Sequence, residues 1–343
     1  MSCEKIEPRR SGSIYLSICL WVAVLLVPSD PRSLAEPRHQ ASVSVLKPGT
    51  RVLLDAHNCY PYDGKWTNRL DRALSTGTPL AIEQDLAWYI DPQSRQSRIV
   101  VTHDIKLSGQ EPALREYFFE RVRPIMEKAL REGDRGDWPL ITLNLDFKTE
   151  QPDLLAAVWK LLGEFEPWLT TADRATNASD LMPLHVGPML VLTGESDAQE
   201  HAFYENIPVG QKLRVFGAVH VNTEHPTADP QVLVPASADN YRRWWNNPWS
   251  VVEAGGQKKA RAWTDADGTR LASLVNYAHR KGLWIRFYTL DGGSEPTFRA
   301  NGWFSGYDFG SVAAASIRWR AAQEAGVDYI ATDQYEQLAR LLH

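Results

Sequence analysis

The sequence predicts an α/β protein built as a single (β/α)8 barrel of the TIM type. Short apolar segments of strand length alternate with helical segments along nearly the whole chain. Such alternation is typical of a parallel sheet with right-handed crossovers. A length of 343 residues suits one barrel of this class. An open, doubly wound sheet is the alternative, but no glycine-rich dinucleotide-binding motif follows any of the strands.

Seven barrel strands can be assigned from apolar runs of strand length. They span residues 51–56, 79–88, 139–147, 189–193, 213–220, 283–290 and 327–332. We expect the eighth within residues 241–253, a segment with three tryptophans and two valines. Residues 98–103 form one more short strand, which we interpret as an extra hairpin on the second barrel strand.

Apolar residues at helical spacing occupy most of the intervals between these strands. The expected helices cover residues 68–77, 111–133, 151–169, 270–282 and 311–326. Residues 170–187 and 222–240 are instead rich in proline, aspartate and asparagine. This composition predicts two long loop insertions in the barrel.

The N-terminus has the pattern of an export signal. Lys5, Arg9 and Arg10 precede an apolar run at residues 14–27, and residues 33–35 (Ser-Leu-Ala) offer a small-x-small cleavage site. A membrane anchor is the alternative, but this run is shorter than the roughly 20 residues that span a bilayer. We therefore expect cleavage, with the mature protein in the periplasm or outside the cell.

The chain then divides into a signal peptide, a leader and one catalytic barrel. The expected bounds are 1–35, 36–50 and 51–343. Cleavage would remove Cys3 and Cys19 and leave Cys59, so we expect no disulfide partner. The formal net charge of −5 argues against a nucleic-acid partner, which would require clustered lysine and arginine.

Tryptophan is unusually frequent, with thirteen residues in the chain. Five of them stand near strand ends or in predicted loops: Trp88, Trp244, Trp245, Trp249 and Trp303. We hypothesise that these indoles line the barrel mouth as an apolar rim for a lipid or its headgroup, with contact to a membrane surface as a further option.

Three carboxylates are expected at the carboxyl ends of the barrel strands, where barrel enzymes place their active sites. Glu83 and Asp85 stand two residues apart on one strand, so their side chains share a face. Asp146 and Lys148 repeat this spacing on the next barrel strand. Converging carboxylates repel one another unless a cation lies among them, and oxygen ligands favour Mg²⁺ or Ca²⁺. The pattern predicts one bound divalent cation.

Two histidines stand at neighbouring strand ends. His57 and Asn58 close the first strand, and His103 closes the extra hairpin. Two histidines beside a cation and the lysine at position 148 suit acid–base catalysis at a phosphodiester. A further group of His220, Glu224 and His225 suggests a second metal site more weakly, because no carboxylate on a strand accompanies it.

The order of these residues resembles the phospholipase C-like phosphodiesterase superfamily, which includes glycerophosphodiester phosphodiesterases, phosphatidylinositol-specific phospholipases C and venom sphingomyelinase D. The matching segments are His57-Asn58, Glu83-x-Asp85, His103, Asp146-x-Lys148, and the chain endings 288–291 and 326–333. Asp146-x-Lys148 looks more like sphingomyelinase D, and His57-Asn58 departs from the His-Arg-Gly usual in glycerophosphodiesterases.

The resemblance implies a role for each matched residue. His57 and His103 would form the acid–base pair, and Lys148 and Tyr288 would bind the substrate. The implied ligands of the divalent cation are Glu83, Asp85, Asp146 and Asn58. The expected function is therefore an exported, metal-dependent hydrolase of a phospholipid headgroup or a glycerophosphodiester. A non-catalytic or carbohydrate-binding barrel with a tryptophan-rich mouth is the alternative, and a glycosidase using Glu83 and Asp146 would leave both histidines unexplained.

Overall fold

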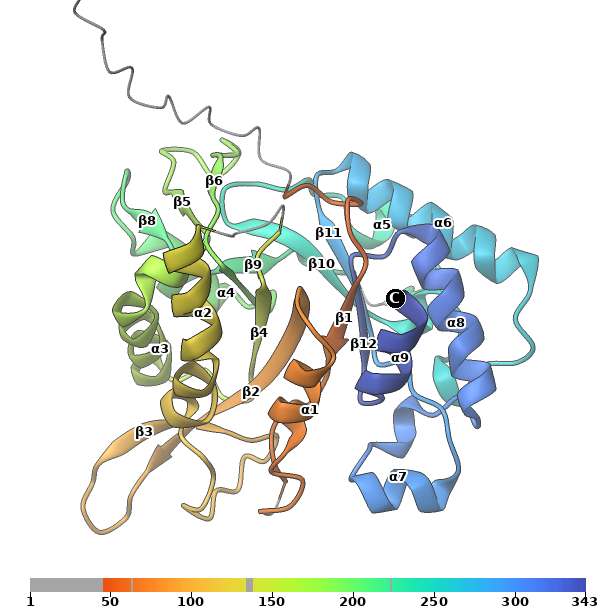
Figure 1. Ribbon diagram of the computed structural model, residues 1–343. Coiled ribbons are helices and arrows are strands. Elements are labelled where there is room, and N and C mark those ends of the chain that lie inside the picture. Colours follow the sequence, from red (N-terminus) through yellow and green to blue (C-terminus); the bar gives the residue numbers. More distant parts are fainter. Residues whose placement is uncertain (1–45, 63, 134–137, 223) are drawn as a thin grey trace, which may run out of the picture. The chain divides into compact units, whose positions relative to one another are not determined.

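A computed structural model describes residues 46–343 except residues 63, 134–137 and 223. The expected signal peptide and most of the expected leader lie outside these residues. The described chain contains a closed barrel of eight parallel strands, seen from the side in Figure 1. Its strands, in spatial order, are β1 (Leu53–Ala56), β12 (Tyr329–Thr332), β11 (Trp284–Tyr288), β10 (Arg242–Pro248), β9 (Phe216–Ala218), β7 (Met189–Thr193), β4 (Ile141–Phe147) and β2 (Leu80–Ile90).

The barrel closes because β1 pairs with both the last strand and the second. This closure confirms the (β/α)8 architecture and rules out the open sheet. The expected eighth strand is β10, inside the interval predicted for it. The extra hairpin is also confirmed, since β3 (Ser97–Val101) pairs antiparallel with the outer half of β2. β9 is shorter than expected, because the chain forms a separate strand, β8 (Lys212–Leu213), before it enters the barrel.

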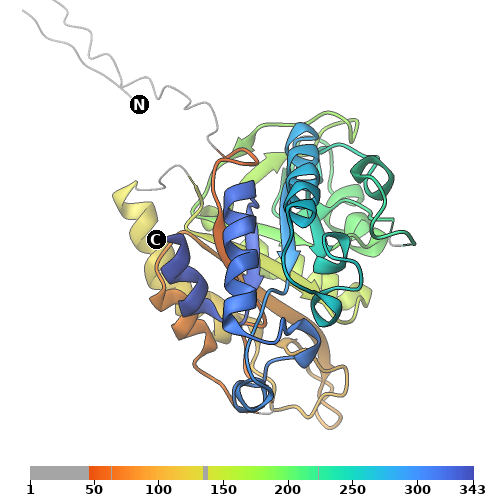
Figure 2. The same ribbon diagram turned by 90° about the vertical axis from the view of Figure 1, so that its right-hand side faces the viewer.

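Helices on the outside of the barrel cover the strands (Figures 1 and 2). The longer ones are α1 (Arg69–Ser75), α2 (Glu120–Glu132), α3 (Pro152–Glu164), α6 (Asp265–Arg280), α7 (Glu295–Asn301), α8 (Val312–Ala325) and α9 (Tyr335–Leu342). The shorter ones are η1 (Arg115–Phe119), η2 (Glu166–Trp168), α4 (Asp197–Glu200), η3 (His201–Glu205), α5 (Pro230–Leu233), η4 (Trp249–Val251), η5 (Gln257–Lys259) and η6 (Ser305–Tyr307). None of the helices in the described part of the chain is both long and apolar enough to cross a membrane.

Two differences from the expected helices have local causes. α6 begins five residues earlier than the apolar spacing indicates, because Thr264 and Asp267 form a capping box that starts the helix in a polar stretch. α9 follows the last strand directly and packs on β1, where no helix was expected.

The two expected insertions contain more structure than loops. Residues 170–187 include β5 (Thr171–Asp173) and β6 (Leu184–His185), which form a separate three-stranded sheet with β8. Residues 222–240 include the short helix α5. In Figure 1 the small sheet lies at one end of the barrel, and α7 and the β2–β3 hairpin lie at the other.

The tryptophans of β10 and its following turn belong to the core, so the predicted aromatic rim is largely wrong. Trp244, Trp245 and Trp249 are all buried. The indole N–H of Trp244 donates to the carbonyl of Thr193 at 2.8 Å, and that of Trp249 donates to Glu253 at 2.7 Å. Barrel strands are covered on both faces, by the barrel interior and by the helices, so adjacent tryptophans on one strand are both buried.

Candidate active site

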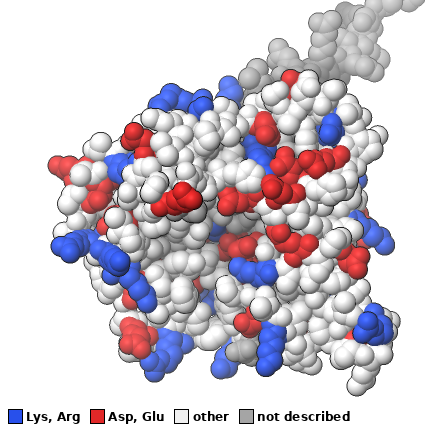
Figure 3. Space-filling view, turned by 180° about the vertical axis from the view of Figure 1, so that it is seen from behind, with Lys and Arg blue, Asp and Glu red and all other residues white. Residues whose placement is uncertain are grey.

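All eight residues predicted for the site line one cavity of about 660 Å³ at the carboxyl ends of the barrel strands. They are His57, Asn58, Glu83, Asp85, His103, Asp146, Lys148 and Tyr288. The loops after β1, β3 and β11 contribute to the same cavity. On the face drawn in Figure 3, acidic and basic side chains of the described residues are mixed.

The three carboxylates converge as the strand periodicity predicts. Asp85 and Asp146 are direct partners in the β2–β4 register, and Glu83 lies one inward-facing position before Asp85. One oxygen of each of the three carboxylates lies within 4.8 Å of the others. Burial, followed by the charges of Asp146 and Glu83, raises the pKa of Asp85 well above its ordinary value. The carboxylates therefore repel one another, as a cation site requires.

These side chains fit a hard divalent cation. Asp85 is buried, and its Oδ1 atom has no hydrogen-bond partner among the described residues. Asp146 is half-exposed and opens to the cavity. Three carboxylate oxygens around one point, with room for water on the cavity side, are typical ligands of Mg²⁺ or Ca²⁺.

Lys148 neutralises part of this cluster. Its Nζ atom lies 2.9 Å from Asp85 and 2.8 Å from Asp146. Burial alone would lower the pKa of Lys148, but the two aspartates raise it, so the ammonium stays charged. The side chain thus places a positive charge at the wall of the cavity.

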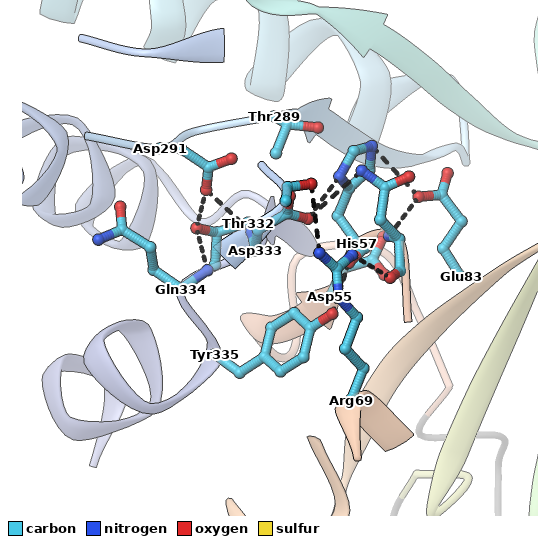
Figure 4. Close-up of polar contacts among 12 residues, drawn as sticks. Asp55, His57, Arg69, Glu83, Thr289, Asp291, Thr332, Asp333, Gln334 and Tyr335 are labelled. Atoms are coloured by element: carbon cyan, nitrogen blue, oxygen red, sulfur yellow. Dashed lines mark hydrogen bonds and ion pairs between the residues drawn. The ribbon is translucent and has the colours of Figure 1, made fainter. Parts of the chain in front are cut away.

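His57 is held at both ring nitrogens by carboxylates (Figure 4). Its Nδ1 atom lies 2.8 Å from Asp333, and its Nε2 atom lies 3.3 Å from Glu83. Burial opposes the charged imidazole, but Glu83 and Asp333 raise the pKa of His57 to about 9. A carboxylate on Nδ1 orients the ring and leaves Nε2 directed at the carboxylate cluster.

The backbone at Asp333 is held in place by hydrogen bonds to Asp291. Its backbone N–H donates to the Asp291 carboxylate at 2.8 Å, and the Thr332 hydroxyl donates to the same oxygen at 2.5 Å (Figure 4). Burial and the charge of Asp333 raise the pKa of Asp291 to about 8. The sequence places both aspartates in the closing segments of the chain, but no local pattern assigns either of them a role at the site.

Arg286 belongs to the site although it is not among the residues that the sequence predicts there. It is buried on β11, lines the cavity, and forms ion pairs with Asp55 and with Glu83, the latter at 3.2 Å. It also donates to the Asn246 side chain at 3.1 Å. Although burial opposes the charge of Glu83, His57 and Arg286 lower its pKa to about 2. An arginine two residues before Tyr288 on a barrel strand faces the same side, and this spacing was the available signal.

The other predicted site residues differ in how firmly they are held. Asn58 has a left-handed backbone with φ of 50°, and its side-chain oxygen accepts a hydrogen bond from Tyr60 at 2.7 Å. That oxygen is therefore less available to a cation than the three carboxylates. His103 lies on the open side of the cavity, where burial and the nearby Lys148 lower its pKa.

Aromatic side chains form the outer wall of the cavity. They are Tyr62, Tyr288, Trp303, Phe304 and Tyr307. Trp303 is the one member of the predicted rim among these lining residues, and Trp88 instead borders a separate groove beside β3. Tyrosines, a phenylalanine and Trp303, rather than the tryptophans of β10, thus provide the apolar surface at the mouth.

The suggested second metal site has a different composition from the one expected. His220 lies near Asp197 and Glu200, not with Glu224 and His225. The Arg242 guanidinium pairs with Glu200 at 2.5 Å and lies 3.5 Å from Asp197, so a cation is already present there.

Comparisons with known proteins yield structural likenesses alone. No family model matches the chain, and no curated protein sequence matches it. A glycerophosphoryl diester phosphodiesterase from Parabacteroides distasonis is similar over 84% of this chain and 85% of its own, with 15% identity and a TM-score of 0.40. The HPPK-DHPS protein of Plasmodium falciparum is similar over 86% of this chain and 48% of its own, with 9% identity and a TM-score of 0.42.

The closed eight-stranded barrel is the architecture that the resemblance to the phospholipase C-like superfamily implies. The chemistry of the site has to be inferred from its own side chains.

Proposed function

We propose that this chain is an exported, divalent-metal-dependent phosphodiesterase that hydrolyses a glycerophosphodiester or a phospholipid headgroup. One observation carries the proposal: three carboxylates meet within 4.8 Å at the mouth of a parallel barrel, in a cavity that two histidines and a lysine also line. Residues from four separate strand ends contribute these groups. A purely structural cluster would have no need of a solvent-open cavity at its centre.

The proposed ligands of the cation are Glu83, Asp85 and Asp146. When bound, a divalent cation would act as a Lewis acid that offsets the negative charge of the phosphoryl oxygens. Lys148 supplies a second positive charge on the same wall, since its Nζ atom already lies among these carboxylates. Both charges favour a transition state in which negative charge grows on the phosphoryl group.

The proposed acid–base pair is His57 and His103. A phosphodiester needs one group to take a proton from the attacking oxygen and another to protonate the leaving oxygen. His57 is oriented by Asp333 and directed into the cavity, whereas His103 lies on its open side. No side chain has to act as nucleophile, and the buried thiol of Cys59, whose pKa is raised by burial, is unsuited to that role.

The substrate is proposed to be small. A volume of about 660 Å³ accommodates a headgroup-sized diester. The aromatic outer wall suits the carbon skeleton of an alcohol or the start of an acyl chain, while the inner wall is polar and charged. The net charge of −5 disfavours an extended polyanion such as nucleic acid.

Hydrolysis of bis(p-nitrophenyl) phosphate tests the proposal. We expect turnover by the full chain with Mg²⁺ or Ca²⁺, loss of turnover in EDTA, and recovery when the metal is restored. Asp85→Asn and His57→Ala should each lower kcat by about 100-fold or more, which is the usual contribution of one acid–base group or of charge stabilisation. Asp197→Asn, in the exposed cluster beside Arg242, is the matched control and should retain full activity.

The outcomes separate the alternatives. Turnover that EDTA leaves unchanged would contradict the proposed cation. If turnover depends on the metal, a panel of glycerophosphodiesters, phosphoinositides and choline phospholipids identifies the headgroup of the substrate. If no diester were hydrolysed and calorimetry detected binding of a sugar, the result would instead support the non-catalytic, carbohydrate-binding barrel.

A further inference from the structure

The segment between β11 and α8 closes one side of the active-site cavity. We call residues 302–310 the mouth loop; four of them, Gly302, Trp303, Phe304 and Tyr307, line the cavity. The loop follows α7, at the end of the barrel where the strands terminate (Figure 1). The position of this loop decides which aromatic side chains face a ligand in the cavity and which of them contact His57.

Tyr307 contacts the ring of His57 directly. The two ring centroids lie 5.6 Å apart with an interplanar angle of 84°, which is edge-to-face geometry. Tyr307 makes similar contacts with Tyr288, at 6.4 Å, and with Phe304, at 5.2 Å. All of these are contacts of the ring. Asp333 and Glu83 hold the two nitrogens of His57, and the ring of Tyr307 packs against the imidazole in addition.

The backbone of Tyr307 is tied to the same support that holds Asp333. The N–H of Asp291 donates to the carbonyl of Tyr307 at 3.3 Å, and the N–H of Phe309 donates to the carbonyl of Asp291 at 2.9 Å. The carboxylate of Asp291 accepts the N–H of Asp333 at 2.8 Å. Contacts therefore run in a closed ring from His57 through Asp333, Asp291 and Tyr307 back to His57.

The other end of the mouth loop is anchored beside His57 as well. The buried guanidinium of Arg69 donates to the carbonyls of Asn301 and Gly302, at 2.8 and 3.3 Å. It also donates to the carbonyl of Asn58, the residue after His57, at 2.7 Å. Hydrogen bonds thus anchor both ends of the loop to segments that also hold His57 or its neighbours. These anchors fix the position of Tyr307 beside the imidazole.

We propose that Tyr307 is a positioning residue whose aromatic ring holds His57 in its catalytic orientation, with Asp291 joining the mouth loop to the Asp333–His57 pair. This inference rests on the proposed function, because it concerns the same histidine. It assigns the role to the ring and not to the hydroxyl, since the contacts with His57 and its neighbours are edge-to-face. Tyr307 acts through His57 and need not touch the phosphate.

Steady-state kinetics with bis(p-nitrophenyl) phosphate provide the first test. Tyr307→Leu should lower kcat by about three- to tenfold, the range expected for loss of one edge-to-face contact, with KM changed less than twofold. Tyr307→Phe should restore kcat, because it keeps the ring. Tyr307→Met is a second non-aromatic variant in case the leucine variant does not fold. Tyr89→Leu, which removes a partly exposed tyrosine over Arg98, is the control and should match the wild type.

Each departure from this pattern would overturn the inference. A rise in KM with unchanged kcat would mean that Tyr307 binds substrate directly. A Tyr307→Phe variant as impaired as Tyr307→Leu would assign the effect to the hydroxyl. Equal losses in Tyr89→Leu would trace it to a general loss of aromatic packing.

A second readout does not depend on turnover. In protein labelled with ¹³C,¹⁵N-histidine, the His57 ring resonances can be assigned by their absence in His57→Gln. They should shift in Tyr307→Leu and stay near wild-type positions in Tyr307→Phe, because an adjacent aromatic ring displaces them. Unchanged resonances in Tyr307→Leu would refute the positioning role. If the wild type hydrolysed no diester, the proposed function would fail while this measurement still decided the position of His57.

Discussion

Asp333→Asn provides the sharpest test of how the site positions its histidine. Asp333 is buried and accepts the Nδ1 proton of His57 at 2.8 Å. The asparagine keeps the shape of the side chain but removes its charge. A hydrogen bond to a charged group contributes about 1.5–3 kcal/mol. If that energy is needed to hold the cationic His57 ring in its reactive orientation, kcat should fall by roughly 10- to 150-fold, at about 1.4 kcal/mol for each factor of ten.

Asp328→Asn is the matched control. Asp328 and Asp333 stand immediately before and after β12, and each pairs with a histidine, Asp328 with His279 at 2.9 Å. Asp328 also accepts the backbone N–H groups of Gly49 and Ile285. Its replacement should lower the free energy of unfolding by about 1–3 kcal/mol without changing kcat, because it lies at the opposite end of the strand from the cavity.

The assay is hydrolysis of bis(p-nitrophenyl) phosphate at saturating metal, with the folded state checked by thermal unfolding. A kcat for Asp333→Asn within twofold of the wild type would refute the role of Asp333. An equal fall in kcat for Asp328→Asn would show that the effect comes from loss of stability and not from the Asp333–His57 bond.

Three further predictions concern buried or paired groups. Lys148→Met should raise the affinity of the site for Mg²⁺ or Ca²⁺ by about tenfold or more, because the ammonium that pairs with Asp85 and Asp146 is removed. Calorimetry with the metal alone measures this affinity, and an unchanged value would contradict the prediction. Burial raises the pKa of Asp291 to about 8, so between about pH 4 and 8 the folded state retains a proton that the unfolded state has lost. The free energy of unfolding, measured in urea, should therefore decline as pH rises from about 4 to 8. Asp291→Asn should flatten this decline. A wild-type stability that is constant over this range would exclude such a shift. Burial also raises the pKa of Cys59, so its thiol should react with DTNB in urea and not in the native protein, where rapid labelling would show that it is accessible.

The barrel and its carboxylates could be predicted because their signals are local. Glu83 and Asp85 stand two apart on a strand, and strand geometry alone puts such residues on one face. The same rule applies to Asp146, and parallel pairing of β2 with β4 then brings the three together. His57 and His103 could be predicted for a similar reason, since each ends a strand.

The tryptophans illustrate where local signals fail. Trp244 and Trp245 are adjacent in the sequence and point to opposite sides of β10, yet both are buried. An isolated strand does not reveal that helices cover its outer face, so an interval rich in tryptophan is compatible with a core or with an exposed rim. The barrel provides buried acceptors for indole N–H groups, such as the carbonyl of Thr193 for Trp244, so such side chains can be buried in the core.

The sequence by itself determined the alternation of strands and helices and the residues that carry the proposed chemistry, because both depend on spacings of a few residues. The tertiary structure alone decided which distant residues support them. Asp333 lies 276 positions from His57 and Arg286 lies 203 positions from Glu83, and they meet because β1 pairs with β12 to close the barrel. Partners across a closed barrel depend on strand order and register around the whole circumference, which no short stretch of sequence contains.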